Sequence, residues 1–212
     1  MIAGVEIDVG PDATWVRSAT PLRVLGSAVV GGGFDAARHL VNMRVPEGHR
    51  CVDPAGDLRD FAERLGIAEP FVGLMTAART EDARIAWEEA DGVRVGVLAT
   101  VGLGMPVAAG LTPPVAWQPS TINVVVLLDA AMERATAVNG VITATEAKVG
   151  ALVEAGIASA DGTPATGTVT DAVVVAWTGR GPILPYLGSG TMAGWCLAKA
   201  VRRAVGQGIP SR

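Results

Sequence analysis

Two mainly apolar segments, residues 122–128 and 173–177, lie on either side of a long helical pattern, and this arrangement constrains the fold more than any other feature of the chain. Short apolar runs are typical of strands that are buried on both faces. Apolar side chains recur at steps of three and four between residues 130 and 154, which predicts one long helix; they are Ala131, Ala135, Val138, Ile142, Val149, Leu152 and Val153. The order strand, helix, strand predicts a crossover unit.

The first half of the chain predicts antiparallel pairing instead. Strands are expected at residues 5–8, 15–18 and 22–30, with turns at Gly10-Pro11-Asp12 and Thr20-Pro21. Asp91-Gly92, between residues 84–89 and 93–101, predicts a β-hairpin. We therefore predict an α+β fold in a single domain, residues 1–212. It has a mixed, largely antiparallel sheet covered by helices, with two stacked sheets between helix layers as the variant.

The charge and the apolar runs exclude several classes of function. A net charge of -4 and a pI near 5.2 disfavour nucleic acid, which needs a clustered basic surface. The apolar stretches are too short or too interrupted to span a membrane, and the first residues do not resemble a secretory signal. The two cysteines match no metal or redox spacing. We expect a cytoplasmic protein that acts on a small molecule, and the oligomeric state stays open, a homo-oligomer included.

Two polar runs stand out in this apolar chain. The first is Thr143-Ala144-Thr145-Glu146-Ala147-Lys148, on the predicted long helix, and the second is Ala165-Thr166-Gly167-Thr168-Val169-Thr170-Asp171, just before a predicted strand. Polar groups beside apolar runs must be hydrogen-bonded, functional or both. The runs are therefore the first candidates for a site.

Helical geometry assigns a direction to each side chain of the first run. At about 100° per residue, Thr145 falls in the centre of the apolar stripe between Val138 and Val149, with Glu146 and Lys148 on its borders. We expect Thr145 to face the core or the floor of a cleft. The alternatives are a Thr145 hydroxyl bonded to the preceding turn and charges that are only solvated.

In the second run, Thr166, Thr168 and Thr170 share one face if the segment is extended. Asp171 can then accept hydrogen bonds from backbone amides or from a substrate amide. A turn held by Asp and Thr side chains is the alternative.

Other polar residues are weaker candidates. Ser27 stands before Gly31-Gly32-Gly33, which permits a close backbone approach but lacks the pattern of a nucleotide-phosphate loop. His39 and Asn42 form the polar pair nearest to this glycine run, and His39 has a pKa range suited to a general base, although a lone histidine is more often structural. The spacing of His and Cys residues predicts no metal site.

Several further segments, in this order, resemble one family: Leu25-Gly26-Ser27-Ala28 with Gly31-Gly32-Gly33 and Val41-Asn42; Gly73-Leu74-Met75-Thr76-Ala77-Ala78; Ala99-Thr100-Val101-Gly102; and Ser120-Thr121-Ile122-Asn123. Together with the two polar runs they cover nearly the whole chain, and the sequence resembles the adenosylcobinamide amidohydrolases of corrinoid salvage. The resemblance implies hydrolysis of adenosylcobinamide to adenosylcobyric acid and aminopropanol, with the corrinoid as substrate and no cofactor. A protein on the same scaffold that binds a corrinoid or another small ligand without turnover, or an unrelated amidase, would be the alternatives.

The expected site follows from these residues. The catalytic candidates are Glu146, Lys148, Asp171 and His39. The substrate-binding candidates are Ser27, Asn42, Thr76, Asn123, Thr145, Thr166, Thr168 and, in a Pro-rich loop over residues 105–119, Trp117. Two mechanisms stay open: a carboxylate that activates water, or a Ser or Thr nucleophile assisted by Lys148, with Asn123 or backbone amides holding the oxyanion. No metal is expected to take part, and the alternative is a hard cation held by the carboxylates of Asp171 and Glu146.

Overall fold

The computed structural model describes residues 1–68, 70–114 and 121–210. Eight strands form one sheet in the order β4-β3-β2-β11-β8-β6-β5, with β1 paired to β2. Their bounds are β1 Val5–Val9, β2 Ala13–Gly26, β3 Gly33–Arg44, β4 Val72–Thr76, β5 Arg84–Ala90, β6 Val93–Val101, β8 Ile122–Asp129 and β11 Ala172–Trp177. Two small ladders pair β7 (Pro106–Val107) with β10 (Gly167–Thr168), and β9 (Ala131–Met132) with β12 (Ile183–Leu184).

The sheet is mixed and mostly antiparallel, as predicted. Within it the parallel pairs are β3–β4 and β8–β11. Helix α2 (Arg134–Glu154) lies between β8 and β11 in the chain, so the predicted crossover unit is confirmed. Helix α1 (Pro54–Arg64) connects the parallel strands β3 and β4 in the same way. The other helices are the short η1 (Thr80–Asp82) and, near the C-terminus, α3 (Met192–Gly208).

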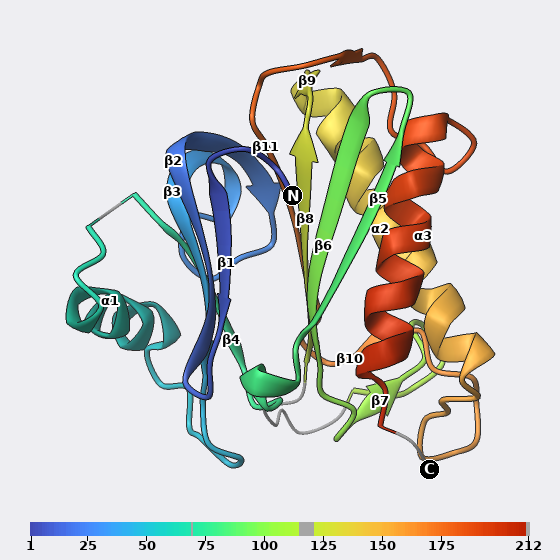
Figure 1. The fold of residues 1–212 in the computed structure, drawn as a ribbon. Coiled ribbons are helices and arrows are strands. Elements are labelled where there is room, and N and C mark those ends of the chain that lie inside the picture. The colour runs from blue at the N-terminus through green and yellow to red at the C-terminus, as the bar shows by residue number, and fades with distance from the viewer. Residues whose placement is uncertain (69, 115–120, 211–212) are drawn as a thin grey trace.

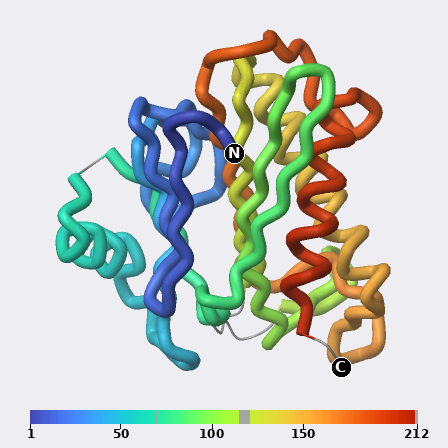
Figure 2. Tube along the Cα trace, in the orientation of Figure 1, coloured from blue at the N-terminus to red at the C-terminus, as the bar shows by residue number. Residues whose placement is uncertain are grey.

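The sheet bends so strongly that its two halves face each other (Figure 1). Apolar residues of β3 and β4, such as Leu40 and Leu74, share one core cluster with Leu98 of β6 and Leu127 of β8. Helices α2 and α3 cover the outer face of β5, β6, β8 and β11, and α1 covers the outer face of β3 and β4 (Figures 1 and 2). The result is a helix, sheet, sheet, helix layering made from one continuous sheet.

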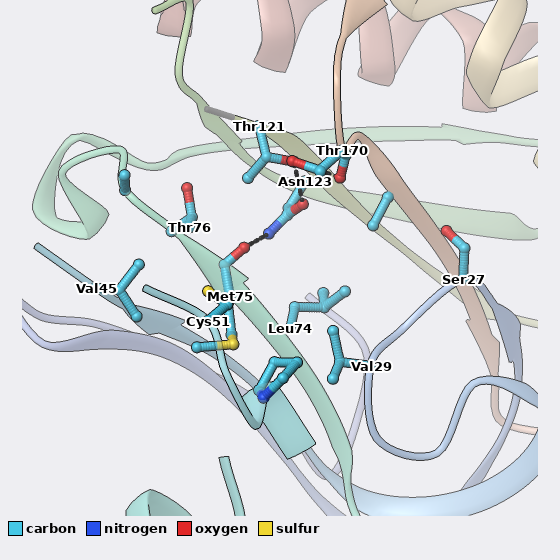
Figure 3. Close-up of a pocket in the computed structure, with 13 residues that line it drawn as sticks. Ser27, Val29, Val45, Cys51, Leu74, Met75, Thr76, Thr121, Asn123 and Thr170 are labelled. Atoms are coloured by element: carbon cyan, nitrogen blue, oxygen red, sulfur yellow. Dashed lines mark hydrogen bonds between the residues drawn. The ribbon is translucent and has the colours of Figure 1, made fainter. Parts of the chain in front are cut away.

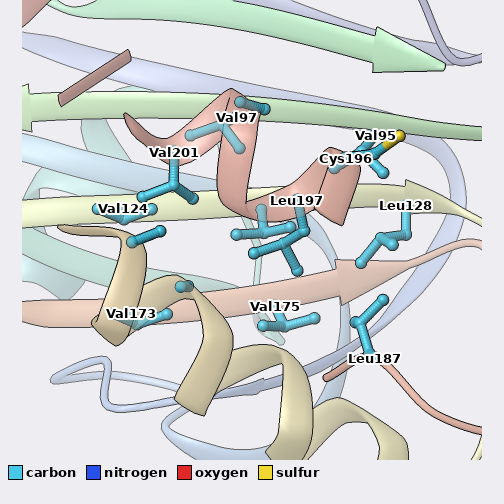
Figure 4. Close-up of a cluster of buried hydrophobic side chains, with 14 of the residues drawn as sticks. Val95, Val97, Val124, Leu128, Val173, Val175, Leu187, Cys196, Leu197 and Val201 are labelled. Atoms are coloured by element: carbon cyan, nitrogen blue, oxygen red, sulfur yellow. The ribbon is translucent and has the colours of Figure 1, made fainter. Parts of the chain in front are cut away.

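The largest cluster lies under α2 and α3 (Figure 4). Val95, Val97, Val124 and Leu128 point from the sheet toward α3, where they meet Cys196, Leu197 and Val201. Val173 and Val175 of β11 lie under α2 in the same cluster. These residues are at most 7% exposed. Val124 and Val173 are also neighbours in the parallel β8–β11 ladder, so the crossover unit supplies the centre of this cluster.

The predicted hairpin between β5 and β6 is confirmed. Asp91 and Gly92 have φ values of 52° and 74°, and a two-residue turn with both φ angles positive matches the twist of the strands. Two other local predictions are wrong. Pro21 does not end a strand, because β2 continues through an irregularity between Arg17 and Leu22 where its register with β3 shifts and a missing backbone donor costs little. Residues 105–119 are not all loop, since β7 pairs with β10.

The rotation of α2 about its axis also differs from the prediction. Its buried face is formed mainly by small residues, with Ala137, Gly140, Ala144 and Ala151 among them, while Val138, Ile142 and Val153 face outward. A Cβ on Gly140 would lie 2.7 Å from the side chain of Leu187. Close packing against the sheet and α3 therefore selects the small-residue face, and the larger apolar stripe is left at the surface.

Candidate active site

Buried amide and hydroxyl side chains connect the two facing halves of the sheet at one end. Asn123 of β8 donates from Nδ2 to Asn42 Oδ1 and to the carbonyl oxygen of Met75, both at 2.8 Å. Asn42 of β3 in turn donates to Thr100 Oγ1 of β6 at 2.9 Å. Asn42, Thr100 and Asn123 are at most 4% exposed. Because β3 and β6 are not neighbours in the sheet, this network exists only because the sheet bends.

Thr121 extends the network toward the start of β11. Its hydroxyl lies 2.7 Å from the carbonyl oxygen of Thr170 and 3.1 Å from Asn123 Oδ1. The parallel strands β8 and β11 begin at Ile122 and Ala172, so Thr121 and Thr170 both lie at their amino ends. Hydrogen bonding at this point holds the two strand starts together.

A buried ion pair between Lys148 of α2 and Asp171 lies beside these strand starts. The two side chains are 7% and 12% exposed, and Lys148 Nζ donates to Asp171 Oδ2. The same carboxylate accepts from the backbone N–H of Ile122 at 3.0 Å, from that of Thr168 at 3.1 Å and from the Thr168 hydroxyl. Asp171 therefore joins α2, β8 and the segment before β11.

Gly167 makes room for this ion pair. A Cβ at this position would lie 2.7 Å from Lys148 Nζ and closer still to Asp171 Oδ2. Side chains other than hydrogen would therefore displace the pair. Glycine is therefore required between Thr166 and Thr168 in the second polar run for a steric reason.

A cavity of about 150 Å³ opens beside the network (Figure 3). Thr76, Thr121, Asn123 and Thr170 gather at one end of it, and Val29, Val45, Cys51, Leu74 and Met75 form an apolar wall. Ser27 lies at an exposed edge, where its Oγ accepts a hydrogen bond from the backbone N–H of Val173 at 3.3 Å. Thr76 Oγ1 accepts from the backbone N–H of Ala78 at 3.0 Å. The cavity thus combines an apolar wall with hydroxyl groups.

The cavity wall includes a thiol that stays neutral. Burial, followed by the nearby Asp57 carboxylate, raises the pKa of Cys51 above its ordinary value. A raised pKa disfavours the thiolate, which is the nucleophilic form. Cys51 therefore contributes to the cavity as a small apolar group. The threonine hydroxyls of the cavity are better suited than this thiol to contact polar groups of a ligand.

The family assignment follows from sequence comparison. A model of the family described as adenosylcobinamide amidohydrolase matches residues 1–212. The chain belongs to this family. It is 29% identical over 195 residues to the adenosylcobinamide amidohydrolase of Methanosarcina mazei, covering 88% of this chain and 90% of that protein. It is 38% identical over 149 residues to the protein of the same name from Halobacterium salinarum, covering 66% of this chain and 58% of that protein.

The predicted resemblance to the adenosylcobinamide amidohydrolase family, and with it the amidohydrolase class, is thereby confirmed. Among solved structures, the PH0078 protein from Pyrococcus horikoshii OT3 matches with a TM-score of 0.47 and 13% identity, covering 99% of this chain and 78% of its own. That likeness is too distant to bear on function.

Many residues predicted for the site of this family member do lie together. Ser27, Thr76 and Asn123 line the cavity, and Asn42 is bonded to Asn123. Thr168 is bonded to the Lys148–Asp171 pair. Thr166 is further along the same segment, where its hydroxyl accepts from the backbone N–H of Ala109 at 2.9 Å.

Other predicted residues lie elsewhere. The expectation that Thr145 faces the core is wrong: it is exposed, and its hydroxyl donates to the carbonyl oxygen of Val141 at 2.8 Å, the backbone alternative foreseen for it. Glu146 is also exposed on α2 rather than lining the cavity, and its catalytic role stays a prediction. Trp117 lies outside the described residues.

His39 lies apart from Asn42, the other member of the predicted polar pair. Residues three apart on a strand point to opposite faces, and His39 accepts at Nδ1 from Trp15 Nε1 at 3.2 Å on the α1 side of the sheet. Burial, then the charges of Arg17 and Arg38, lowers the pKa of His39. His39 is therefore a neutral acceptor that does not line the cavity.

Sequence reasoning did not single out Thr100, Thr121 or Cys51. Thr100 and Thr121 stand within segments that carry the family resemblance, and their position beside predicted strand ends was the available signal. Cys51 carries no such signal, because it reaches the cavity through the loop between β3 and α1. Within the described residues, no three His, Cys, Asp or Glu side chains gather as a metal site requires.

Proposed function

We propose that this chain hydrolyses the amide that links aminopropanol to the corrin ring of adenosylcobinamide, which releases aminopropanol and adenosylcobyric acid. The observation that carries the proposal is the family match over residues 1–212. It is supported by the cavity, whose hydroxyl groups lie next to the amide network and the buried ion pair. No described helix is long and apolar enough to cross a membrane, and a cytoplasmic reaction remains our expectation from the sequence.

The size of the cavity suggests which part of the substrate enters it. A closed cavity of about 150 Å³ accommodates a benzene-sized molecule, and the cavity here has about that volume. The corrin ring is far larger, whereas the aminopropanol arm is slightly smaller than benzene. We therefore propose that the arm enters between the apolar wall and the hydroxyl groups, and that the ring stays outside.

The hydrogen bonds restrict which groups contact the reacting amide. Both Nδ2 protons of Asn123 are already donated, to Asn42 and to Met75, so we assign Asn123 to holding the cavity wall. Asp171 accepts from four donors, so its two carboxylate oxygens are already occupied by hydrogen bonds within the protein. We assign Lys148 and Asp171 to holding the starts of β8 and β11 beside the cavity.

Thr76 is then the best-placed donor to the substrate carbonyl. Its oxygen accepts from the N–H of Ala78, and within the described residues its own proton has no protein acceptor. A hydroxyl in this state can donate to the carbonyl oxygen as negative charge develops on it. Glu146 and His39, which do not line the cavity, are not part of this proposal.

The test is incubation of the purified chain with adenosylcobinamide, followed by mass detection of adenosylcobyric acid. We expect product from the native chain and, because one oxyanion donor contributes about 100-fold or more to kcat, a loss of that order in Thr76→Val. Thr143→Val is the matched control, since Thr143 is another buried threonine, whose hydroxyl donates to Leu187 at 2.9 Å.

Binding of adenosylcobinamide without product would instead identify a corrinoid-binding protein. An unchanged kcat in Thr76→Val would remove Thr76 from the proposal.

A further inference from the structure

Helix α2 is apolar on both of its faces, although the described residues cover only one of them. The inner face packs on the sheet and on α3. On the opposite face Val138, Ile142, Thr145 and Val149 form a row that we call the outer stripe, and Val153 continues it. Val138, Ile142 and Val153 are 47%, 50% and 53% exposed. A helix that is apolar all round is normally buried on both sides.

The charge pattern of α2 also indicates that the outer stripe is covered in the native protein. Between residues 135 and 153 the charged residues are Glu146 and Lys148, and Lys148 points inward to Asp171. Glu146 is thus the one charge that this stretch presents to solvent. A solvated helix face usually carries several charged residues, so the outer stripe has the composition of a contact surface.

The spacing of the outer stripe indicates what covers it. Its residues are separated by steps of four, three and four, which is the spacing of a helix–helix seam. The sequence of steps, four, three and four, is the same from either end of the stripe. Two antiparallel copies of α2 would therefore match residue for residue, with Val138 against the second copy's Val149 and Ile142 against the second copy's Thr145.

We infer that the outer stripe of α2 is the contact between two copies of this chain, packed antiparallel about a two-fold axis. A two-fold contact must be complementary to itself, and most soluble oligomers are built in this way. A lipid surface fits less well. Helices that lie on membranes carry Lys and Arg along their polar face, whereas the exposed basic residue of α2 is Arg134 alone.

The contact would also bear on the candidate active site. Lys148 extends from the inner face of the same helix, one turn from Thr145. Pairing of the outer stripes would restrict the motion of the helix that holds the ion pair.

The oligomeric state tests this inference. Sedimentation equilibrium of the native chain should give twice the chain mass of 21.6 kDa, and high salt should not dissociate the dimer because the contact is apolar. Ile142→Glu should give the monomer mass, with a native circular dichroism spectrum. Ile183→Glu is the matched control, since Ile183 of β12 is an exposed isoleucine, 81% accessible, that is not part of the outer stripe; this variant should remain a dimer.

A second variant tests the antiparallel arrangement. Because Ile142 faces the second copy's Thr145, Ile142→Glu combined with Thr145→Lys should restore a dimer, now one that salt weakens. A monomeric native chain at tens of micromolar, or a dimer that Ile142→Glu leaves intact, would overturn the inference. Failure of the double variant to associate would overturn the antiparallel register. None of these outcomes depends on hydrolysis of adenosylcobinamide.

Discussion

Removal of Asp171 should destabilise the protein more than removal of Lys148, although the two residues form one ion pair. Asp171 keeps three donors when Lys148 is lost: the N–H groups of Ile122 and Thr168, and the Thr168 hydroxyl. Lys148 has no other acceptor among the described residues when Asp171 is lost. The two single variants therefore leave very different groups behind in the interior.

The magnitudes follow from these partners. Asp171→Ala leaves the ammonium group of Lys148, a residue that is 5% exposed, without its ion-pair partner. An uncompensated buried charge costs about 3–5 kcal/mol of stability. Lys148→Met keeps the length of the side chain and leaves a carboxylate that is still hydrogen-bonded, so we expect about 1–3 kcal/mol. The double variant contains no stranded charge, so it should be more stable than Asp171→Ala alone.

Urea unfolding followed by circular dichroism at neutral pH measures all three free energies of unfolding, provided that the m-value stays constant. A loss in Lys148→Met as large as that in Asp171→Ala would contradict the role given to the three remaining donors. A double variant no more stable than Asp171→Ala would show that the stranded ammonium is not the cause of the loss.

Four further predictions concern the site and its surroundings. Gly167→Ala should displace the Lys148–Asp171 ion pair and so lower both stability and turnover. Gly188→Ala is the control and should change neither, because a Cβ at Gly188 meets nothing within 4 Å. Urea unfolding and the product assay compare the two variants. The hypothesis that Glu146 is catalytic requires Glu146→Gln to abolish turnover, but its exposure favours retained activity in the same assay. The pKa of His39 is lower in the folded chain than its ordinary value of 6.5. The contribution of His39 to stability is therefore complete above pH 6.5 and is lost as the pH falls through the pKa of the folded state. His39→Phe should flatten the pH dependence of the urea midpoint between these two pKa values. Hydrolysis should survive prolonged chelation, and activity that is lost and then restored by an added metal would show a metal-dependent mechanism.

The elements that could be predicted are those whose signal is local. Asp91-Gly92 takes the positive φ angles of its turn, and Thr191 caps α3 by accepting from the N–H of Gly194 at 3.0 Å. The crossover unit of β8, α2 and β11 was also apparent from its apolar pattern. Strand β3 was not predicted, because exposed and buried residues do not alternate regularly along it.

The candidate site was predicted only in part, for a related reason. The two polar runs do meet, through Lys148 and Asp171. Helical periodicity, however, describes the angles between side chains and not which side of the helix faces the sheet. Thr145 was therefore placed on the wrong side of the helix, and the small-residue face that packs inward was overlooked.

The sequence by itself determined the class of fold, the family and the identity of the polar residues, because turn residues, apolar periods and motifs are properties of neighbouring positions. Tertiary structure decided the bend of the sheet, the rotation of α2 and the cavity. Asn42, Thr76, Thr100 and Asn123 come from four strands, and the bond between Asn42 and Thr100 joins positions 58 residues apart in the chain. Such contacts depend on how the two halves of the sheet pack around their common core, and the free energy of that packing is shared among many side chains rather than recorded in any short segment.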